Sequence, residues 1–265
     1  MSASVMLLVV ACSTNAITGR RQLSLVPESQ LQQMAQTEYR SFLSQNNVVG
    51  ASQSKDAEMV KRVGSRIANA VTSYYKGKGL GSEVENYQWE YNLVRDPAAN
   101  AWCMPGGKIV VYSGLLPVTQ NEAALAVVVG HEVAHALAQH GSERMSQGLL
   151  QQLGGVALDV ALSSKSQETR GLFNQAYGVG SQVAYALPHS RKQELEADKL
   201  GLIYTALAGY NPREAVPLWE RMKSMSDGNR PPQFLSTHPA EDTRIAELKR
   251  HMPAALKYYK PVGSK

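Results

Sequence analysis

The chain has 265 residues, of which 43% are hydrophobic and 18% charged, and its formal net charge is +5. A chain of this length and composition can bury one large core, so a single main domain is predicted rather than two. The basic residues are scattered, without a long Lys/Arg run or interleaved aromatic residues, which argues against a nucleic-acid-binding protein.

The first residues predict a leader and a polar tether. An apolar run from Val5 to Ala11 is too short to span a bilayer and is followed directly by Cys12, which resembles a bacterial lipobox with Cys12 as the lipidated residue. Residues 1–4 lack the Lys or Arg of a signal peptide, so a disordered or clipped N-terminus is the alternative. We expect a signal, lipobox and tether over 1–26 and the folded domain over 27–265.

The next segments predict helices followed by strands. Residues 27–44 and 55–75 carry apolar side chains at helical spacing. Residues 88–95 and 108–112 are the clearest strands, and nearly everything after Gly114 has helical spacing. The predicted fold class is therefore α+β, mainly helical with a small sheet.

The segment NAWCMPGG, which starts at Asn100, is predicted to lie beside an extended ligand. Gly106 and Gly107 are a turn signal, and glycines beside an edge strand allow another backbone to approach. The strand that follows can then hydrogen-bond an extended polypeptide through its main chain. The substrate-binding candidates are Asn100, Gly106, Gly107, Lys108, Ile109 and Val110. The alternative is an ordinary hairpin of the core, with Cys103 as a small buried hydrophobic residue.

A buried helix is predicted to carry the string HEVAH. Thr119 and Glu122 fit a Thr-x-x-Glu capping box, and the residues after them are apolar on nearly every face. His131 and His135 stand four residues apart on one face, so both ring nitrogens can reach the same metal ion.

Glu132 lies about a third of a turn from these histidines. It can take a proton from a metal-bound water without being a ligand itself. The alternative is a pair of core histidines with no metal. His140 is predicted to lie off the metal face, either at the surface or behind the ligands.

Residues 145–187 are rich in Ala, Gly, Gln and Ser and predict two packed helices. Asp159, Lys165 and Arg170 interrupt any membrane span in this stretch. The helical pair is predicted either to cover a cleft or grip a partner, or to be a plain helical hairpin.

The string SRKQELEAD predicts a second helix with a third metal ligand, which a catalytic zinc site needs beside an open position. Ser190 can cap this helix, and Glu194 and Asp198 lie one turn apart on the same face. Glu194 can coordinate the metal, while Asp198 can accept the free N–H of a ligating histidine. Glu196 points to the other side, and His189 is not taken as a ligand. The alternative is a solvated, charged helix face.

Four ordered strings resemble one family. NAWCMPGG, HEVAH, SRKQELEAD and the string THPAEDTR from Thr237 to Arg244 are similar to the motifs of the membrane-associated gluzincin metallopeptidases, which include the CAAX prenyl proteases and the bacterial proteases HtpX and BepA. The resemblance covers most of residues 25–250, and the N-terminus favours a bacterial lipoprotein branch.

The resemblance implies a zincin-type catalytic domain with one zinc ion per chain. The family's zinc ligands map onto His131, His135 and Glu194, its catalytic base onto Glu132 and its supporting aspartate onto Asp198.

The role of His238 is open. The histidine of this motif in BepA-like members can occupy the open zinc position and hold the enzyme off, or it can assist the oxyanion of the tetrahedral intermediate. The alternative is a turn histidine before Pro239. Tyr185, Arg191 and Arg244 are further oxyanion candidates, and Arg244 is also a candidate to support the metal ligands.

The function expected is a zinc endopeptidase that hydrolyses misfolded or unassembled cell-envelope proteins, lipid-anchored in the bacterial envelope and facing the periplasm, at the outer membrane. The alternative is an envelope holding or assembly factor whose zinc site is silenced by His238, with envelope assembly proteins as partners. A structural zinc domain is disfavoured because Glu132 and an open fourth position have no structural purpose.

Overall fold

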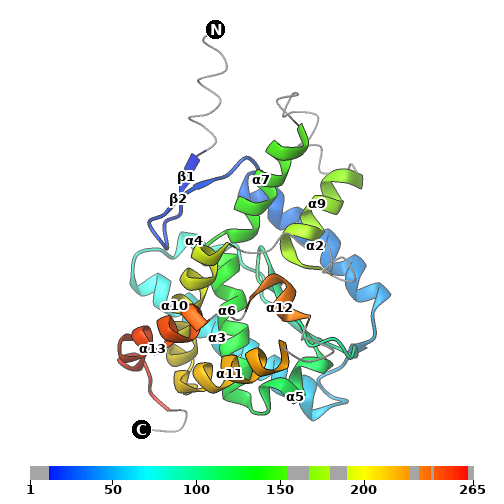
Figure 1. Cartoon of the computed structure of the whole chain (residues 1–265). Helices are drawn as coiled ribbons and strands as arrows, with labels where there is room; N and C mark the ends of the chain where they lie inside the picture. The colour runs from blue at the N-terminus through cyan, green and yellow to red at the C-terminus, as the bar shows by residue number, and fades with distance from the viewer. Residues whose placement is uncertain (1–11, 154–166, 180–189, 227–232, 240–241, 262–265) are drawn as a thin grey trace.

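The computed structural model describes residues 12–153, 167–179, 190–226, 233–239 and 242–261 (Figure 1). Its helices are α2 (Glu28–Gln45), α3 (Lys55–Gly77), α4 (Ser82–Glu85), α5 (Leu116–Thr119), α6 (Glu122–Leu137), α7 (His140–Leu153), α9 (Gln167–Tyr177), α10 (Arg191–Leu207), α11 (Ala215–Ser226), α12 (Phe234–Thr237) and α13 (Asp242–Leu256), with short turns η1 (Ser113–Leu115) and η3 (Pro212–Glu214). Its strands are β1 (Cys12–Thr14), β2 (Arg21–Leu23), β3 (Val48–Val49), β4 (Glu90–Val94), β5 (Ala101–Met104) and β6 (Lys108–Tyr112). The mainly helical fold with a small sheet is confirmed.

The larger sheet has the strand order β3-β4-β6-β5. β6 is parallel to β4 and antiparallel to β5. The predicted strand over Lys108–Tyr112 is confirmed, but the expectation that it is an edge strand is wrong, because both of its sides are paired. The edge strand beside β6 is β5, and the two-residue β3 forms the opposite edge of the sheet. Gly106 and Gly107 form the turn between β5 and β6 with φ of 76° and 82°, a conformation that favours glycine.

The two faces of the sheet are covered by different helices. Ile109 and Val111 of β6 pack into a core formed with α3, α6 and α10, while Val110 and Tyr112 pack into a second core formed with α2, α7 and α9. Side chains alternate across a strand, so β6 is buried on both faces. This burial explains the unbroken apolar run that its sequence shows.

Helix α6 lies at the centre of the molecule, and α10 packs along it (Figure 1). The first residue of α6 is capped by Asn121, whose side chain accepts a hydrogen bond from Ala124 N, so the predicted cap at Thr119 is wrong. The predicted cap of α10 at Ser190 is confirmed as a capping box with Gln193. Gly130 on α6 and Gly201 on α10 allow the helices to approach closely. A Cβ on Gly130 would lie 3.0 Å from Gly201 O, and a Cβ on Gly201 would lie 3.0 Å from His131 Cα and N.

The segment predicted as a polar tether instead folds onto the domain from residue 12 onward. β1 and β2 pair antiparallel, and the buried Asn15 donates a hydrogen bond of 3.0 Å to Leu137 O at the end of α6. The apolar run from Val5 to Ala11 lies outside the described residues. Among the described helices, none combines the length and the hydropathy that crossing a bilayer requires.

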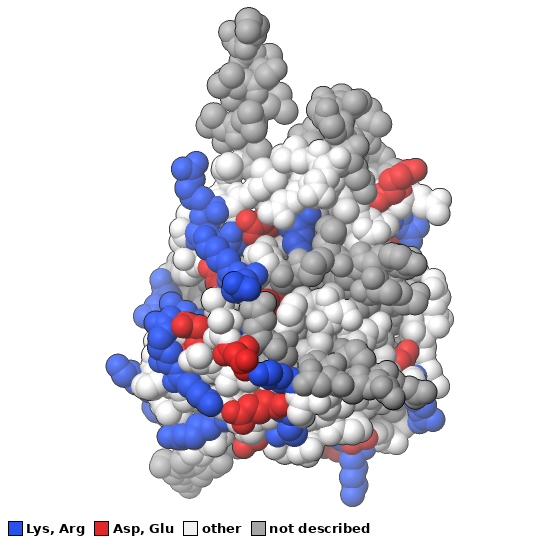
Figure 2. All heavy atoms as spheres, viewed as in Figure 1, with Lys and Arg blue, Asp and Glu red and all other residues white. Residues whose placement is uncertain are grey.

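The described part of the stretch 145–187 belongs to α7 and α9, which pack together as predicted. Asp159 and Lys165 lie outside the described residues. Figure 2 shows acidic and basic side chains interspersed on one face, with more basic ones over the side that carries α10 and α13. This mixture agrees with the scattered charges of the sequence.

Candidate metal centre

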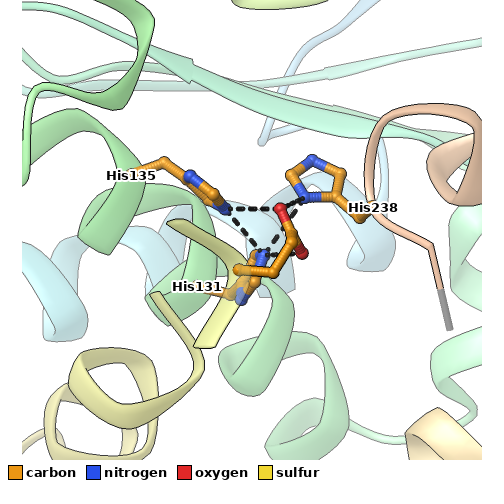
Figure 3. Close-up of side chains that lie close together, drawn as sticks. His131, His135 and His238 are labelled. Atoms are coloured by element: carbon orange, nitrogen blue, oxygen red, sulfur yellow. Dashed lines mark hydrogen bonds and ion pairs between the residues drawn. The ribbon is translucent and has the colours of Figure 1, made fainter. Parts of the chain in front are cut away.

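Four buried side chains converge at the centre of the domain. His131 and His135 project from α6, Glu194 from α10, and His238 directly follows α12 (Figure 3). One ligand atom from each lies within 4.8 Å of the others, and all four residues are buried. The two histidines and the glutamate predicted as ligands are therefore brought together, and His238 joins them.

The distances between these atoms fit a single zinc ion. His131 Nε2 lies 2.9 Å from His135 Nε2 and 3.2 Å from His238 Nδ1. Glu194 Oε1 lies 3.3 Å from His135 Nε2 and 2.9 Å from His238 Nδ1. Ligand atoms at the corners of a zinc tetrahedron with bonds of about 2.0–2.1 Å are about 3.3 Å apart. Nitrogen and carboxylate donors are also the set that zinc takes in catalytic sites.

Glu132 lies beside this cluster without belonging to it. Its Oε1 is buried, accepts no hydrogen bond from the described residues, and lies 3.5 Å from His238 Nε2. Burial raises the pKa of Glu132 to about 8. Together with His135 and His238 it lines a cavity of about 20 Å³, roughly the space of one water molecule. An acceptor with no partner thus faces a space that water can fill.

The back of His131 is held by a buried ion-pair network. Its Nδ1 lies 3.0 Å from Asp198 Oδ1. Arg244 donates to both oxygens of Asp198, at 2.8 Å and 2.7 Å, and its Nη1 lies 2.6 Å from Glu194 Oε2. The guanidinium of Arg244 also lies 3.7 Å from the ring centre of Trp219. Asp198 and Arg244 therefore lie where the sequence placed them, behind the ligands.

These contacts set the charges of the metal-free site. Burial opposes the charge on His131, but the contacts with Asp198 and Glu194 raise the pKa of His131 to about 9. Burial also opposes the charge on Glu194, yet Arg244 and the histidines hold the pKa of Glu194 well below its usual range. Glu194 is thus ionised and ready for a cation.

His140 lies directly behind the ligand His135. Helix α6 ends at Leu137, Gln139 adopts a φ of 56°, and α7 begins at His140. This bend turns His140 back toward the site, where it is fully buried and its Nδ1 lies 2.8 Å from His135 Nδ1. Of the two predicted positions of His140, the one behind the ligands is therefore confirmed and the one at the surface is wrong.

Other residues of the cavity wall had no sequence signal or have other partners. Arg144 and Tyr177 line the cavity and were missed, while Asn100 and Cys103 line it from the β5 side. Of the oxyanion candidates, Arg244 is engaged by carboxylates and Arg191 is exposed at the start of α10. Tyr185 and His189 lie outside the described residues.

Two histidines one helical turn apart, a glutamate from a second helix and a further glutamate beside the cluster define a metallopeptidase of the His-Glu-x-x-His type. Residues 54–252 match the model of peptidase family M48, and the chain belongs to that family. The resemblance to gluzincin metallopeptidases is thereby confirmed at the level of the family.

Several curated relatives are similar over most of the chain. The mitochondrial metalloendopeptidase OMA1 of Saccharomyces cerevisiae is 34% identical over 71% of this chain and 54% of its own length. The Arabidopsis thaliana protein of the same name is 35% identical over 71% of this chain and 37% of its own length. The beta-barrel assembly-enhancing protease of Yersinia pestis is 28% identical over 61% of this chain and 34% of its own length. The chain thus spans about half or less of these relatives.

The predicted location in the bacterial cell envelope is wrong, because the relatives of 34% and 35% identity are mitochondrial proteins. The comparison likewise gives no support to a bacterial lipoprotein branch. Cys12 is exposed, and its acylation, which was predicted together with that location, stays an untested prediction.

Proposed function

We propose that the chain is a zinc-dependent endopeptidase with Glu132 as the general base. The observation that carries this proposal is the buried Oε1 of Glu132, which has no hydrogen-bond partner among the described residues and lies beside a water-sized cavity at a four-residue metal site. Zinc bound there would lower the pKa of a bound water and polarise a peptide carbonyl.

The protein's own groups perform the proton transfers. Glu132 accepts the proton of the attacking water and later returns it to the leaving amine. His131, His135 and Glu194 would hold the metal, and Asp198 fixes the orientation of the His131 ring through its Nδ1.

An extended polypeptide is proposed to pair with β5. Tyr112 N donates to Asn100 O, so Trp102 forms the next hydrogen-bonded pair with β6, while the backbone groups of Ala101 and Cys103 face away from it. Ala101 and Cys103 line the same cavity as Glu132. The pairing role that the sequence gave to Lys108, Ile109 and Val110 thus moves to β5. Recognition through the main chain suits unfolded or unassembled polypeptides of varied sequence.

A second candidate function rests on the position of His238. Its Nδ1 lies 3.2 Å from His131 Nε2 and 2.9 Å from Glu194 Oε1, where a fourth ligand would stand. A catalytic zinc site needs that position for water. In this arrangement His238 keeps the site silent until it moves, and a permanently silent site would leave a holding factor.

One experiment separates these functions: cleavage of an unfolded protein such as casein by the zinc-loaded chain, with zinc content measured in parallel. Glu132→Gln should retain zinc and lose activity by a factor of about 10² to 10⁴. His238→Ala should retain zinc and cleave faster than the wild type. Binding of casein without cleavage by any zinc-loaded variant would favour the holding factor.

A further inference from the structure

A chain of polar contacts leads away from the metal ligand His135. Its Nε2 faces His131 and Glu194, and its Nδ1 lies 2.8 Å from His140 Nδ1. A histidine that binds metal through Nε2 carries its proton on Nδ1 and needs an acceptor there. His140 Nδ1 is that acceptor, so the proton of His140 lies on Nε2.

The second nitrogen of His140 has a partner that suits this proton. His140 Nε2 lies 2.8 Å from Glu196 Oε2, and the carboxylate can only accept. Glu196 lies on α10, as Glu194 does, but on its other side. The same helix therefore supplies a candidate metal ligand, Glu194, and the partner of His140. His135 thus donates to His140, and His140 donates to Glu196, so the two hydrogen bonds run in the same direction.

Glu196 is held in turn by an arginine from the start of the chain. Arg20 Nε donates to Glu196 Oε2 at 3.0 Å, and its two other nitrogens donate to Glu143 at 2.9 Å and 2.7 Å. Both carboxylates are largely buried, with side-chain exposures of 19% for Glu196 and 12% for Glu143. The planar guanidinium therefore fixes both carboxylates at once.

Arg20 lies in the hairpin of β1 and β2, which is fastened beside α6 and α7. Asn15 donates to Leu137 O, and Gln22 Nε2 donates to Gln139 Oε1 at 3.0 Å. The side chain of Asn15 also accepts hydrogen bonds from Ile17 N and Thr18 N, which shapes the hairpin turn. Arg20 is thus held in place at both ends of the hairpin.

We propose that the N-terminal hairpin, residues Cys12–Leu23, positions the zinc ligand His135 through Arg20, Glu196 and His140. The hairpin is a positioning element of the metal site, and the three side chains are positioning residues that touch neither metal nor substrate. The inference rests on the role of His135 as a zinc ligand. Contacts of this kind typically change metal affinity by about 10- to 100-fold.

The test is the zinc affinity of the metal-stripped full chain, measured by competition with a chromophoric chelator. Arg20→Gln, Glu196→Gln and His140→Phe should each weaken zinc binding by about 10- to 100-fold. Arg20→Lys keeps the charge but loses the planar guanidinium that contacts two carboxylates, so its zinc affinity should lie between that of Arg20→Gln and that of the wild type. Arg21→Gln is the matched control, because Arg21 is the neighbouring exposed arginine and should leave the affinity unchanged. The visible spectrum of the Co²⁺-substituted chain should change in Arg20→Gln, Glu196→Gln and His140→Phe but not in Arg21→Gln.

A second measurement uses the reciprocity of linked equilibria. If the hairpin strengthens zinc binding, zinc strengthens the docking of the hairpin by the same factor. Hydrogen exchange at the β1 and β2 amides should therefore slow when zinc is added to the wild type, and this slowing should be absent in His140→Phe.

Three results would overturn the proposal or the site on which it rests. Wild-type zinc affinity and an unchanged Co²⁺ spectrum in Arg20→Gln and His140→Phe would show that the contacts from Arg20 to His135 are only structural. This holds even if both variants unfold more easily. A wild-type chain that binds no zinc would remove the metal site itself, and with it the proposed peptidase. If the wild type cleaves casein and the variants of Arg20, Glu196 and His140 bind zinc normally, the positioning role alone is overturned.

Discussion

The two histidines of α6 are supported in contrasting ways. Behind His131 stands one carboxylate, Asp198, fixed by Arg244, and both side chains are 3% exposed or less. Behind His135 stands a second histidine, followed by Glu196 and by Arg20, whose side chain is 12% exposed. The first support is a buried ion-pair network within the C-terminal half. The second is a longer series of polar contacts, more exposed to solvent, that ends in the N-terminal hairpin. We infer that the first mainly holds the fold together and the second mainly sets ligand geometry.

The strongest way to break this comparison is to remove the arginine from each side. Arg244→Gln leaves Asp198 and Glu194 as buried carboxylates without their shared cation, so the free energy of unfolding should fall by about 3–5 kcal/mol. Arg20→Gln removes a partly exposed arginine and should cost roughly 1 kcal/mol. Urea unfolding of the metal-free variants measures both. Equal losses would contradict the division into a structural and a geometric support.

The pH dependence of zinc binding sharpens the same contrast. Burial opposes the charge on His131, but Asp198 and Glu194 raise the pKa of His131 to about 9. Burial is the main cause that holds the pKa of His135 well below its usual value. Zinc must displace the proton of His131, so its affinity should rise about tenfold per pH unit as the pH approaches 9. Because the folded pKa of His131 is raised, its contribution to the stability of the metal-free chain is full below pH 6.5 and is lost as the pH rises through 9.

Chelator competition at several pH values between about 7 and 9 measures this slope. Asp198→Asn removes the charge that raises the pKa of His131 and should flatten it. Glu196→Gln should lower the affinity at every pH without changing the slope. A slope that responds to Glu196 and ignores Asp198 would reverse the assignment of the charged ligand.

The sequence foretold the His131 side far better than the His135 side. Glu194 and Asp198 stand one turn apart on a helix whose start is marked by Ser190, so local periodicity put both on one face. The family resemblance then assigned one to the metal and the other to the space behind a ligand. For His140 the sequence left open a position at the surface and one behind the ligands, because the bend after α6 was not predicted. Gln139, at the bend, has a φ of 56° although it is neither glycine nor proline. Arg20 meets Glu196 across a separation of 176 residues, which no local pattern encodes.

The sheet teaches the same lesson about local and long-range information. The bounds of β6 were predicted because a β-branched run is a local signal, but its neighbours were not, since pairing order depends on the whole chain. The unbroken apolar run IVVY, which follows Lys108, was itself a sign of an interior strand. β5, the edge strand beside β6, lay within a string predicted only as a turn and substrate motif.

The crossing of α6 and α10 should matter to both supports together. A Cβ on Gly201 would lie 3.0 Å from the backbone of His131, and backbone cannot move aside as a side chain can. Gly201→Ala should therefore separate the helices slightly, cost about 1–3 kcal/mol of stability and weaken zinc binding. Gly171→Ala, at a helical position where a Cβ meets nothing within 4 Å, is the control and should not destabilise the chain. Thermal unfolding with and without zinc compares the two variants. Equal unfolding temperatures would show that α6 and α10 can accommodate a methyl group at their crossing.

The smallest effect is expected at the bend that brings His140 to His135. Gln139 has a left-handed φ of 56°, which glycine adopts at no steric cost, so Gln139→Gly should relieve strain of about 1 kcal/mol. The same change removes the acceptor of the Gln22 hydrogen bond, worth roughly 1 kcal/mol, so the net change in stability should be small. Gln139→Val, which resists this φ, should instead displace His140 and weaken zinc binding. If the valine variant binds zinc like the glycine variant, the position of His140 does not depend on the bend, and the contrast between the two supports must come from Glu196 and Arg20 alone.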